Sequence, residues 1–133
     1  MPTIRYCASF VNGEPVLGVI DQPILGERVI GDASGTRCNG KPVRVRPCAA
    51  LADAYLLTPD HLMVGQHFDS KVYDRFTRPV KCYRCTGDGY GYALLACGHT
   101  DIVVDPIMSP WDLAAVIPVV RGAGGVITDW HGK

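Results

Sequence analysis

Residues 105–115 read DPIMSPWDLAA, and residues 122–125 read GAGG. Ser109 suits the N-cap of a helix, and Pro110 suits the first helical position, where a backbone N–H is not needed. The glycines that follow suit a helix end, because glycine adopts the left-handed conformation at little cost. The pattern therefore predicts a helix over Ser109–Arg121, inside which Pro118 would remove one backbone hydrogen bond.

Asp112 lies in the first turn of this helix, where the unpaired amides and the helix dipole favour a negative charge. Two interpretations fit the carboxylate. Ser109 and Asp112 can form a capping box, a common structural motif that the spacing alone favours. Alternatively, Asp112 can be a ligand for a metal ion.

The surrounding residues favour the metal. Asp105, the Trp111-Asp112 pair and residues 122–126 together resemble the C-terminal signature of the inositol monophosphatase superfamily, a group of magnesium-dependent phosphatases. In that signature an aromatic residue followed by Asp opens a helix that ends in a glycine-rich turn and a buried strand. The resemblance implies that Asp112 is a ligand of the catalytic Mg²⁺.

The resemblance covers nearly the whole chain. GVIDQP at 18–23 is similar to a family strand that follows the metal-binding loop, and CNGKPV at 38–43 is similar to a family hairpin. GDGYGYALLACG at 87–98 and GVITDW at 125–130 most resemble the histidinol-phosphate phosphatase branch, whose usual pattern there is a Gly-Asp-x-Tyr helix start.

The family's other metal ligands lie in a Glu-Glu pair and an Asp-Pro-x-Asp-Gly-Thr loop, and this sequence contains neither. We therefore expect residues 1–133 to be a single partial domain that corresponds to the C-terminal half of the family fold. Because Mg²⁺ usually needs one or two carboxylates plus water or phosphate oxygens, one ligand should bind it weakly. The resemblance assigns no catalytic residue, and we expect little or no activity from the isolated chain.

Asp88 and Asp105 are the candidate substrate residues. Ligands of open α/β sheets gather beyond the C-terminal ends of strands, at helix starts. Asp88 is expected to cap a helix that begins at Gly89, and Asp105 to end the strand before Pro106. By resemblance both contact the substrate, with Asp105 replacing the more usual glutamate. An acid at Asp88 suits a cationic amine, as in histidinol phosphate, better than the neutral ring of inositol phosphate, although an N-cap alone would also explain it.

The fold expected from the pattern is α/β with an antiparallel start, as in the C-terminal half of an inositol-monophosphatase-like αβαβα sandwich. Thr3–Val11 and Pro15–Asp21 should pair as a hairpin across Asn12-Gly13. In the β-rich part, residues 1–47, two further strands are expected over Glu27–Gly31 and Val43–Arg46. In the α/β part, residues 51–133, strands are expected over 54–58, 80–83, 101–104 and 126–129, and helices over 70–76, 88–97 and 109–121.

Other motifs carry less chemistry. The glycine-rich run at 122–125 follows a helix and so reads as a C-cap, not as a phosphate cradle. Cys82 and Cys85 could begin a zinc site with Cys97 and His99, but side chains alternate along a strand and the two cysteines should face opposite ways. Most of the six cysteines should be small buried hydrophobes. We expect three histidines, at 61, 67 and 131, to lie in surface loops.

The composition excludes several classes of protein. Thirteen basic and thirteen acidic residues cancel, which argues against binding to nucleic acid. No apolar run is long enough to span a bilayer, and the first residues lack the pattern of a secretory signal, so we expect a cytoplasmic location. We expect a small phosphorylated metabolite as ligand, and a homo-oligomer or association through a face that the truncation exposes. The alternative function is a non-catalytic binding or assembly module that pairs with a partner half.

Overall fold

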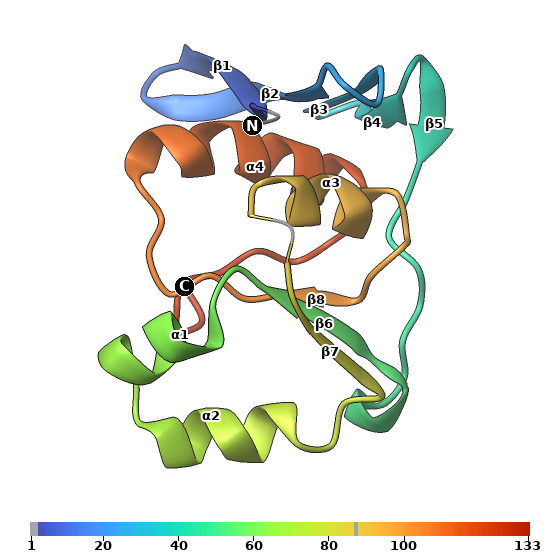
Figure 1. Ribbon diagram of the computed structural model, residues 1–133. Helices are drawn as coiled ribbons and strands as arrows, with labels where there is room; N and C mark the ends of the chain where they lie inside the picture. The colour runs from blue at the N-terminus through green and yellow to red at the C-terminus, as the bar shows by residue number, and fades with distance from the viewer. Residues whose placement is uncertain (1–2, 87) are drawn as a thin grey trace.

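The computed structural model describes residues 3–86 and 88–133, which form four layers (Figure 1). From the top of Figure 1 these are an antiparallel sheet, the helices α3 and α4, a smaller parallel sheet, and the helices α1 and α2. The first sheet has the order β1-β2-β3-β4-β5, with β1 (Arg5–Val11), β2 (Glu14–Gln22), β3 (Glu27–Asp32), β4 (Gly35–Cys38) and β5 (Lys41–Val43). This confirms the α/β class with an antiparallel start.

The second sheet has the order β7-β6-β8, with both pairs parallel. Its strands are β6 (Tyr55–Thr58), β7 (Cys82–Cys85) and β8 (Ile102–Val103), and a short 3-10 turn over Leu51–Asp53 leads into β6. The helices are α1 (His61–His67), α2 (Ser70–Thr77), α3 (Tyr90–Ala96) and α4 (Pro110–Gly122). Because parallel strands need long crossover connections, α1 and α2 join β6 to β7, and α3 lies between β7 and β8.

The predicted first hairpin is confirmed. Asn12 and Gly13 have φ angles of 51° and 82°, the left-handed values that a tight hairpin turn needs. β1 pairs with β2 from Val11 opposite Glu14 to Arg5 opposite Asp21, with a bulge between Ser9 and Phe10. β1 is an edge strand of the sheet.

The strand predicted over Val43–Arg46 is wrong, and β4 was not predicted. β4 forms because turns on both sides allow four residues to pair with β3 and β5. After Val43 the chain leaves the sheet, since its polar groups find other partners. The N–H of Val45 donates to the carbonyl of Ala123 at 3.0 Å, and the guanidinium of Arg46 binds Asp101.

The core lies between the first sheet and α4. Its fully buried members include Ile20 and Val29 from the sheet and Val116 and Val119 from the helix. Two strand glycines let the helix come close: a Cβ on Gly18 would lie 2.0 Å from the carbonyl oxygen of Ala115, and one on Gly31 would lie 2.4 Å from Cα of Val119. The glycines therefore fix how deeply α4 sits on the sheet.

Helix α4 has the predicted bounds to within one residue and runs through Pro118. At its end Gly124 has a φ of 81°, its N–H donates to the carbonyl of Arg121, and the N–H of Gly125 donates to that of Val120. This is a C-cap, so the structural interpretation of the glycine-rich run is confirmed.

Several predicted bounds in the α/β part are wrong. α1 was not predicted, so His61 and His67 lie in a helix and not in loops, although both are exposed. The helix forms because the Asp60 side chain accepts a hydrogen bond from the N–H of Leu62 at 2.8 Å and so caps its start. The predicted strand over 80–83 is shifted to β7, and the helix predicted over 88–97 is reduced to α3.

The strand predicted over 126–129 is also wrong. These residues form no strand and pair with no strand in the described part of the chain. An isolated extended segment leaves its backbone groups without the hydrogen bonds of a sheet. The prediction for the cysteines fails as well. Three are exposed and three partly exposed, because most lie on the outer faces or ends of their elements.

Candidate functional site

The candidate site lies where α3 and α4 begin, next to the C-terminal ends of the parallel strands. Asp112 is in the first turn of α4, Asp105 follows β8, and Asp88 precedes α3. The three carboxylates all act electrostatically on one group, the hydroxyl of Tyr6 in β1. The structure therefore places the three predicted acids near enough to one another for their charges to act on Tyr6, a residue that the sequence analysis did not single out.

Asp112 is held by the start of its helix. The N–H of Ser109 donates to Oδ2 of Asp112 at 3.4 Å, the acidic half of the predicted capping box. At this length the bond is weak, and one carboxylate has lone pairs for further partners. Capping and metal binding are thus compatible roles for Asp112.

Asp105 lies two residues beyond the end of β8. The observed strand is shorter than the one predicted over 101–104, but the acid still follows it. Burial raises the pKa of its carboxyl above the usual value. The N–H of Ile107, which donates to Oδ1 at 3.1 Å, opposes this shift in pKa, and the charges of Asp88 and Asp112 add to it. Ionising Asp105 therefore costs more free energy than it does in water, and an approaching cation or hydrogen-bond donor would offset that cost.

Asp88 does not cap α3, contrary to the prediction. The N-cap is Gly89, and Asp88 has a φ of 36°, in the left-handed region that a residue with a side chain seldom adopts. Only its backbone carbonyl serves the helix, by accepting from the N–H of Gly91 at 3.1 Å. The exposed carboxylate is consequently free for other contacts. Gly87, which begins the predicted Gly-Asp-x-Tyr motif, lies outside the described residues.

Tyr6 points from the edge strand β1 toward the start of α3. A Cβ on Gly89 would lie 1.1 Å from the Tyr6 hydroxyl oxygen, so the ring end fills the space that a side chain at 89 would need. Burial raises the pKa of Tyr6 to about 12, and the charges of Asp112, Asp105 and Asp88 contribute in that order. The hydroxyl therefore stays protonated at neutral pH.

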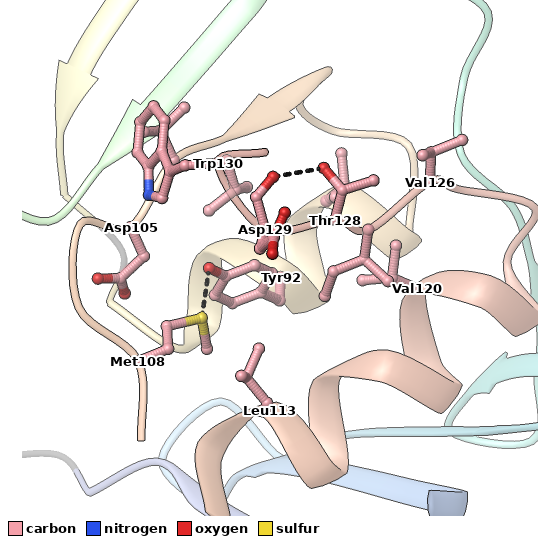
Figure 2. Close-up of a pocket in the computed structure, with 13 residues that line it drawn as sticks. Tyr92, Asp105, Met108, Leu113, Val120, Val126, Thr128, Asp129 and Trp130 are labelled. Atoms are coloured by element: carbon pink, nitrogen blue, oxygen red, sulfur yellow. Dashed lines mark hydrogen bonds between the residues drawn. The ribbon is translucent and has the colours of Figure 1, made fainter. Parts of the chain in front are cut away.

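A cavity of about 240 Å³ adjoins Asp105 on the side away from the first sheet. Figure 2 shows Asp105 at one side of the cavity and Val126 at the other, with the hydroxyl of Tyr92 donating to the sulfur of Met108 at 3.0 Å. Burial, followed by the charge of Asp105, raises the pKa of Tyr92. The cavity is mainly apolar, and one wall is formed by residues 126–129, which were predicted as a strand, and by Trp130.

The donors present fit one metal contact. Within residues 3–86 and 88–133, no three His, Cys, Asp or Glu side chains lie close enough together to hold a metal ion. Asp88, Asp105 and Asp112 therefore do not form a three-ligand metal site by themselves. A single carboxylate is what Mg²⁺ accepts when water and phosphate oxygens supply its other ligands.

The match to a known family identifies the chain. Its residues 7–133 match the model of the inositol monophosphatase family. The chain belongs to the inositol monophosphatase family. The predicted superfamily is thereby confirmed, and the fold is that of its solved members.

Two curated proteins and one solved structure show what this member of the inositol monophosphatase family is similar to. It is 44% identical over 129 residues to the chloroplastic bifunctional phosphatase IMPL2 of Arabidopsis thaliana, covering 95% of this chain and 36% of that protein. It is 39% identical over 125 residues to a histidinol-phosphatase of Chlorobaculum parvum, covering 92% and 48%. Its structure matches an inositol monophosphatase from Zymomonas mobilis with a TM-score of 0.91 and 35% identity, covering 98% and 51%.

The chain thus spans about half the length of these relatives, or less. The relatives are phosphatases, and histidinol-phosphatases are among them, as the resemblance implied. Among the described helices, none is long and apolar enough to cross a membrane.

Proposed function

We propose that this chain forms the metal- and substrate-binding part of a magnesium-dependent phosphomonoesterase that acts on a small phosphorylated alcohol. The observation that carries the proposal is the position of the three acids: Asp88 precedes α3, Asp105 follows β8, and Asp112 lies in the first turn of α4. Three carboxylates in one place attract cations, and partial burial of Asp105 makes an unneutralised charge there unfavourable.

Asp112 is the proposed metal ligand. With Mg²⁺ bound, Asp112 would hold an ion whose chemistry is to neutralise charge on the phosphoryl group and to activate a water molecule. The part of this chain is to hold Asp112 in a fixed place, which it does by burying the rest of α4 against the sheet. Since Asp112 is alone in this role, we propose weak metal binding and little or no turnover by the chain by itself.

Asp88 and Asp105 are the proposed substrate residues. Their negative charges favour a substrate with a cationic amine, such as histidinol phosphate, over the neutral ring of inositol phosphate. Similarity to the histidinol-phosphatase of Chlorobaculum parvum supports the same choice. Replacing Asp88 with Asn should weaken binding of histidinol phosphate more than that of inositol 1-phosphate. An equal loss for both would contradict the proposed role.

A second candidate function is a non-catalytic binding or assembly module that pairs with a partner supplying the other metal ligands. The observation that favours it is the lack of any three-residue metal cluster among the described residues. Magnesium dependence separates the two functions, because only the phosphatase site requires the metal for binding a phosphate ester.

The test is phosphate release from histidinol phosphate and inositol 1-phosphate, with Mg²⁺ and with a chelator, alongside calorimetric binding of both esters. We expect little or no release, and weak ester binding that requires Mg²⁺ and is lost in Asp112→Asn. Turnover that is lost in that variant would show that this chain assembles a working site. Ester binding of the same strength with Mg²⁺, without Mg²⁺ and in Asp112→Asn would favour the binding module.

A further inference from the structure

An open groove of about 420 Å³ lies at the C-terminal end of α4, between that helix and the turn from β3 to β4. Three arginines line it: Arg37 from β4, Arg44 from the position directly after β5, and Arg121 from the last turn of α4. These three side chains define the arginine groove, and no Asp or Glu lines it. The chain as a whole has 13 basic and 13 acidic residues, so this gathering of one charge is local.

The guanidinium groups of the arginine groove have no acidic partner. The ion pairs within residues 3–86 and 88–133 involve other arginines, Arg28, Arg46 and Arg78. Asp32 ends β3 next to the groove, but its Oδ1 already accepts from the N–H and the hydroxyl of Ser34, at 2.7 and 2.6 Å. All three groove arginines are exposed, and each guanidinium carries several N–H donors that an anion can accept.

Backbone forms the floor of the groove. A Cβ on Gly122 would lie 2.6 Å from Oγ1 of Thr36 and 2.8 Å from the carbonyl oxygen of Asp32, so the end of α4 packs directly on the turn before β4. Oγ1 of Thr36 also donates to the carbonyl of Val119 at 2.8 Å. At Gly124 nothing lies within 4 Å of a Cβ, so that side of the groove is open. The arginines therefore extend from a fixed backbone around a space that a ligand can enter.

The arginine groove is separate from the acids at the start of α4. At the rise of an α-helix, Arg121 lies about 13 Å along the axis from Asp112. In Figure 1, β4 and β5 lie toward one end of the first sheet and β1 toward the other. An anion that needs Mg²⁺ in order to approach the acids can therefore bind the arginines without the metal.

We propose that the arginine groove binds a small oligophosphate anion, with two or more linked phosphate groups, which contacts Arg37, Arg44 and Arg121 together. A guanidinium binds phosphate or carboxylate oxygens through two parallel N–H donors. One carboxylate fills one such fork, whereas linked phosphates offer oxygens to all three. A single-stranded nucleic acid is less suited, because it needs aromatic side chains on which its bases stack, and no aromatic residue lines the groove.

The test is a calorimetric titration of the chain with inorganic triphosphate in the presence of a chelator, which removes Mg²⁺. We expect binding by the wild type. Binding should be about tenfold weaker or more in Arg121→Gln, because charge-assisted hydrogen bonds are lost. Arg37→Gln and Arg44→Gln should weaken binding in the same way. Circular dichroism checks that these exposed substitutions leave the fold intact.

Arg75→Gln is the matched control, because Arg75 is also an exposed arginine in the last turn of a helix, α2. It should bind triphosphate as the wild type does. Equal losses in Arg75→Gln and Arg121→Gln would reduce the binding to a general effect of charge and overturn the inference. Absence of binding by the wild type would also overturn it. Both results leave the proposed phosphatase function untouched, since that site requires the metal.

Two other ligands test the class of anion. Citrate, a polycarboxylate, and a short single-stranded oligonucleotide should each bind more weakly than triphosphate. Tighter binding of either one would contradict the assignment to an oligophosphate. In the wild type, the assigned Nε–Hε resonance of Arg121 should also move when triphosphate is added, while that of Arg75 stays in place. An unmoved Arg121 resonance at saturation would place the anion elsewhere.

Discussion

The middle of α4 and its first turn belong to one helix but have opposite environments. Val116, Val119 and Val120 are fully buried against the first sheet and α3. Trp111, in the first turn, is 73% exposed, and the charge of its neighbour Asp112 adds to that of Asp88 in raising the pKa of Asp105. Packing stabilises the middle of the helix, whereas the first turn gathers like charges that oppose one another.

The difference shows how the fold supports its site. Rigid packing of the helix middle fixes the first turn, so that Asp112 needs only the weak capping contact with Ser109 to stay in place. Substitutions in the two regions should therefore have different consequences. Those in the middle of the helix should lower stability. Those in the first turn should weaken binding while leaving stability unchanged or slightly higher.

The largest effect is expected at the glycines under α4. Gly18→Ala would place a Cβ 2.0 Å from the Ala115 carbonyl oxygen, and neither backbone can move away easily. We expect a loss of about 3 kcal/mol or more in the free energy of unfolding, measured with urea. Gly65→Ala in α1 is the control, since nothing lies within 4 Å of its Cβ and alanine favours the helix. Similar losses in both variants would break the comparison.

A second effect concerns the ion pair that fixes the chain between the two sheets. The Asp101 carboxylate is 3% exposed and binds both Arg46 and the N–H of Tyr55. Asp101→Asn should lower the free energy of unfolding by about 2 kcal/mol at pH 7. The control Asp74→Asn breaks an exposed pair with Arg78 and should cost at most about 0.5 kcal/mol.

The same pair gives a pH dependence. The side chain of Arg46, followed by the N–H of Tyr55, holds the pKa of Asp101 below its ordinary value of 3.8. A lowered pKa in the folded state gives stability that is present above 3.8 and is lost as pH falls through the folded value. The difference between the wild type and Asp101→Asn should therefore be full at pH 7 and disappear in strong acid. A difference that grows in acid would contradict the assignment.

A smaller effect is expected at the contact between Tyr6 and Gly89. A Cβ at 89 would overlap the Tyr6 hydroxyl, but the tyrosine end can shift, so Gly89→Ala should cost about 1 kcal/mol. In a Tyr6→Ala background the same change should cost nearly nothing, which a double-mutant cycle measures. Equal costs in both backgrounds would mean that Tyr6 does not occupy this space.

The smallest effect has the opposite sign. Burial and neighbouring charges raise the pKa of Asp105 above 3.8 in the folded state. The chain therefore loses stability as pH rises from 3.8 through the folded pKa, because ionising Asp105 is harder in the folded state than in the unfolded state. Asp105→Asn should therefore stabilise the chain at pH 7, on the order of 0.5 kcal/mol, with no gain at pH 3. Thermal unfolding at the two pH values checks this. A destabilised variant at pH 7 would place Asp105 with the scaffold instead of the site.

The sequence predicted the parts that local rules decide. Asn12-Gly13 fixed the first hairpin, and Ser109-Pro110 with the glycines at 122–125 fixed α4, because turn and cap residues act on their immediate neighbours. Asp105 and Asp112 lie where the pattern put them, next to a strand end and a helix start.

The remaining features depend on tertiary contacts. Tyr6 is 82 positions before Asp88, and no local pattern shows that its hydroxyl reaches the start of α3. In the structure Tyr6 alternates with the exposed Arg5 and Cys7, but the residue types at 5–9 do not alternate clearly between polar and apolar, so the sequence carried no signal for its inward face. The strand predicted over 126–129 failed because strand propensity needs a partner, and Asp88 failed as a cap because its backbone is left-handed.

The most direct test of the metal-binding role of the first turn of α4 is a Mn²⁺ titration, in which electron paramagnetic resonance reports the free ion and Mn²⁺ replaces Mg²⁺. The matched control for Asp112→Asn is Asp53→Asn, since Asp53 is an exposed acid before the start of β6. We predict weak binding by the wild type and by Asp53→Asn, and none by Asp112→Asn. Equal binding by all three chains would contradict the assignment of Asp112 as the metal ligand.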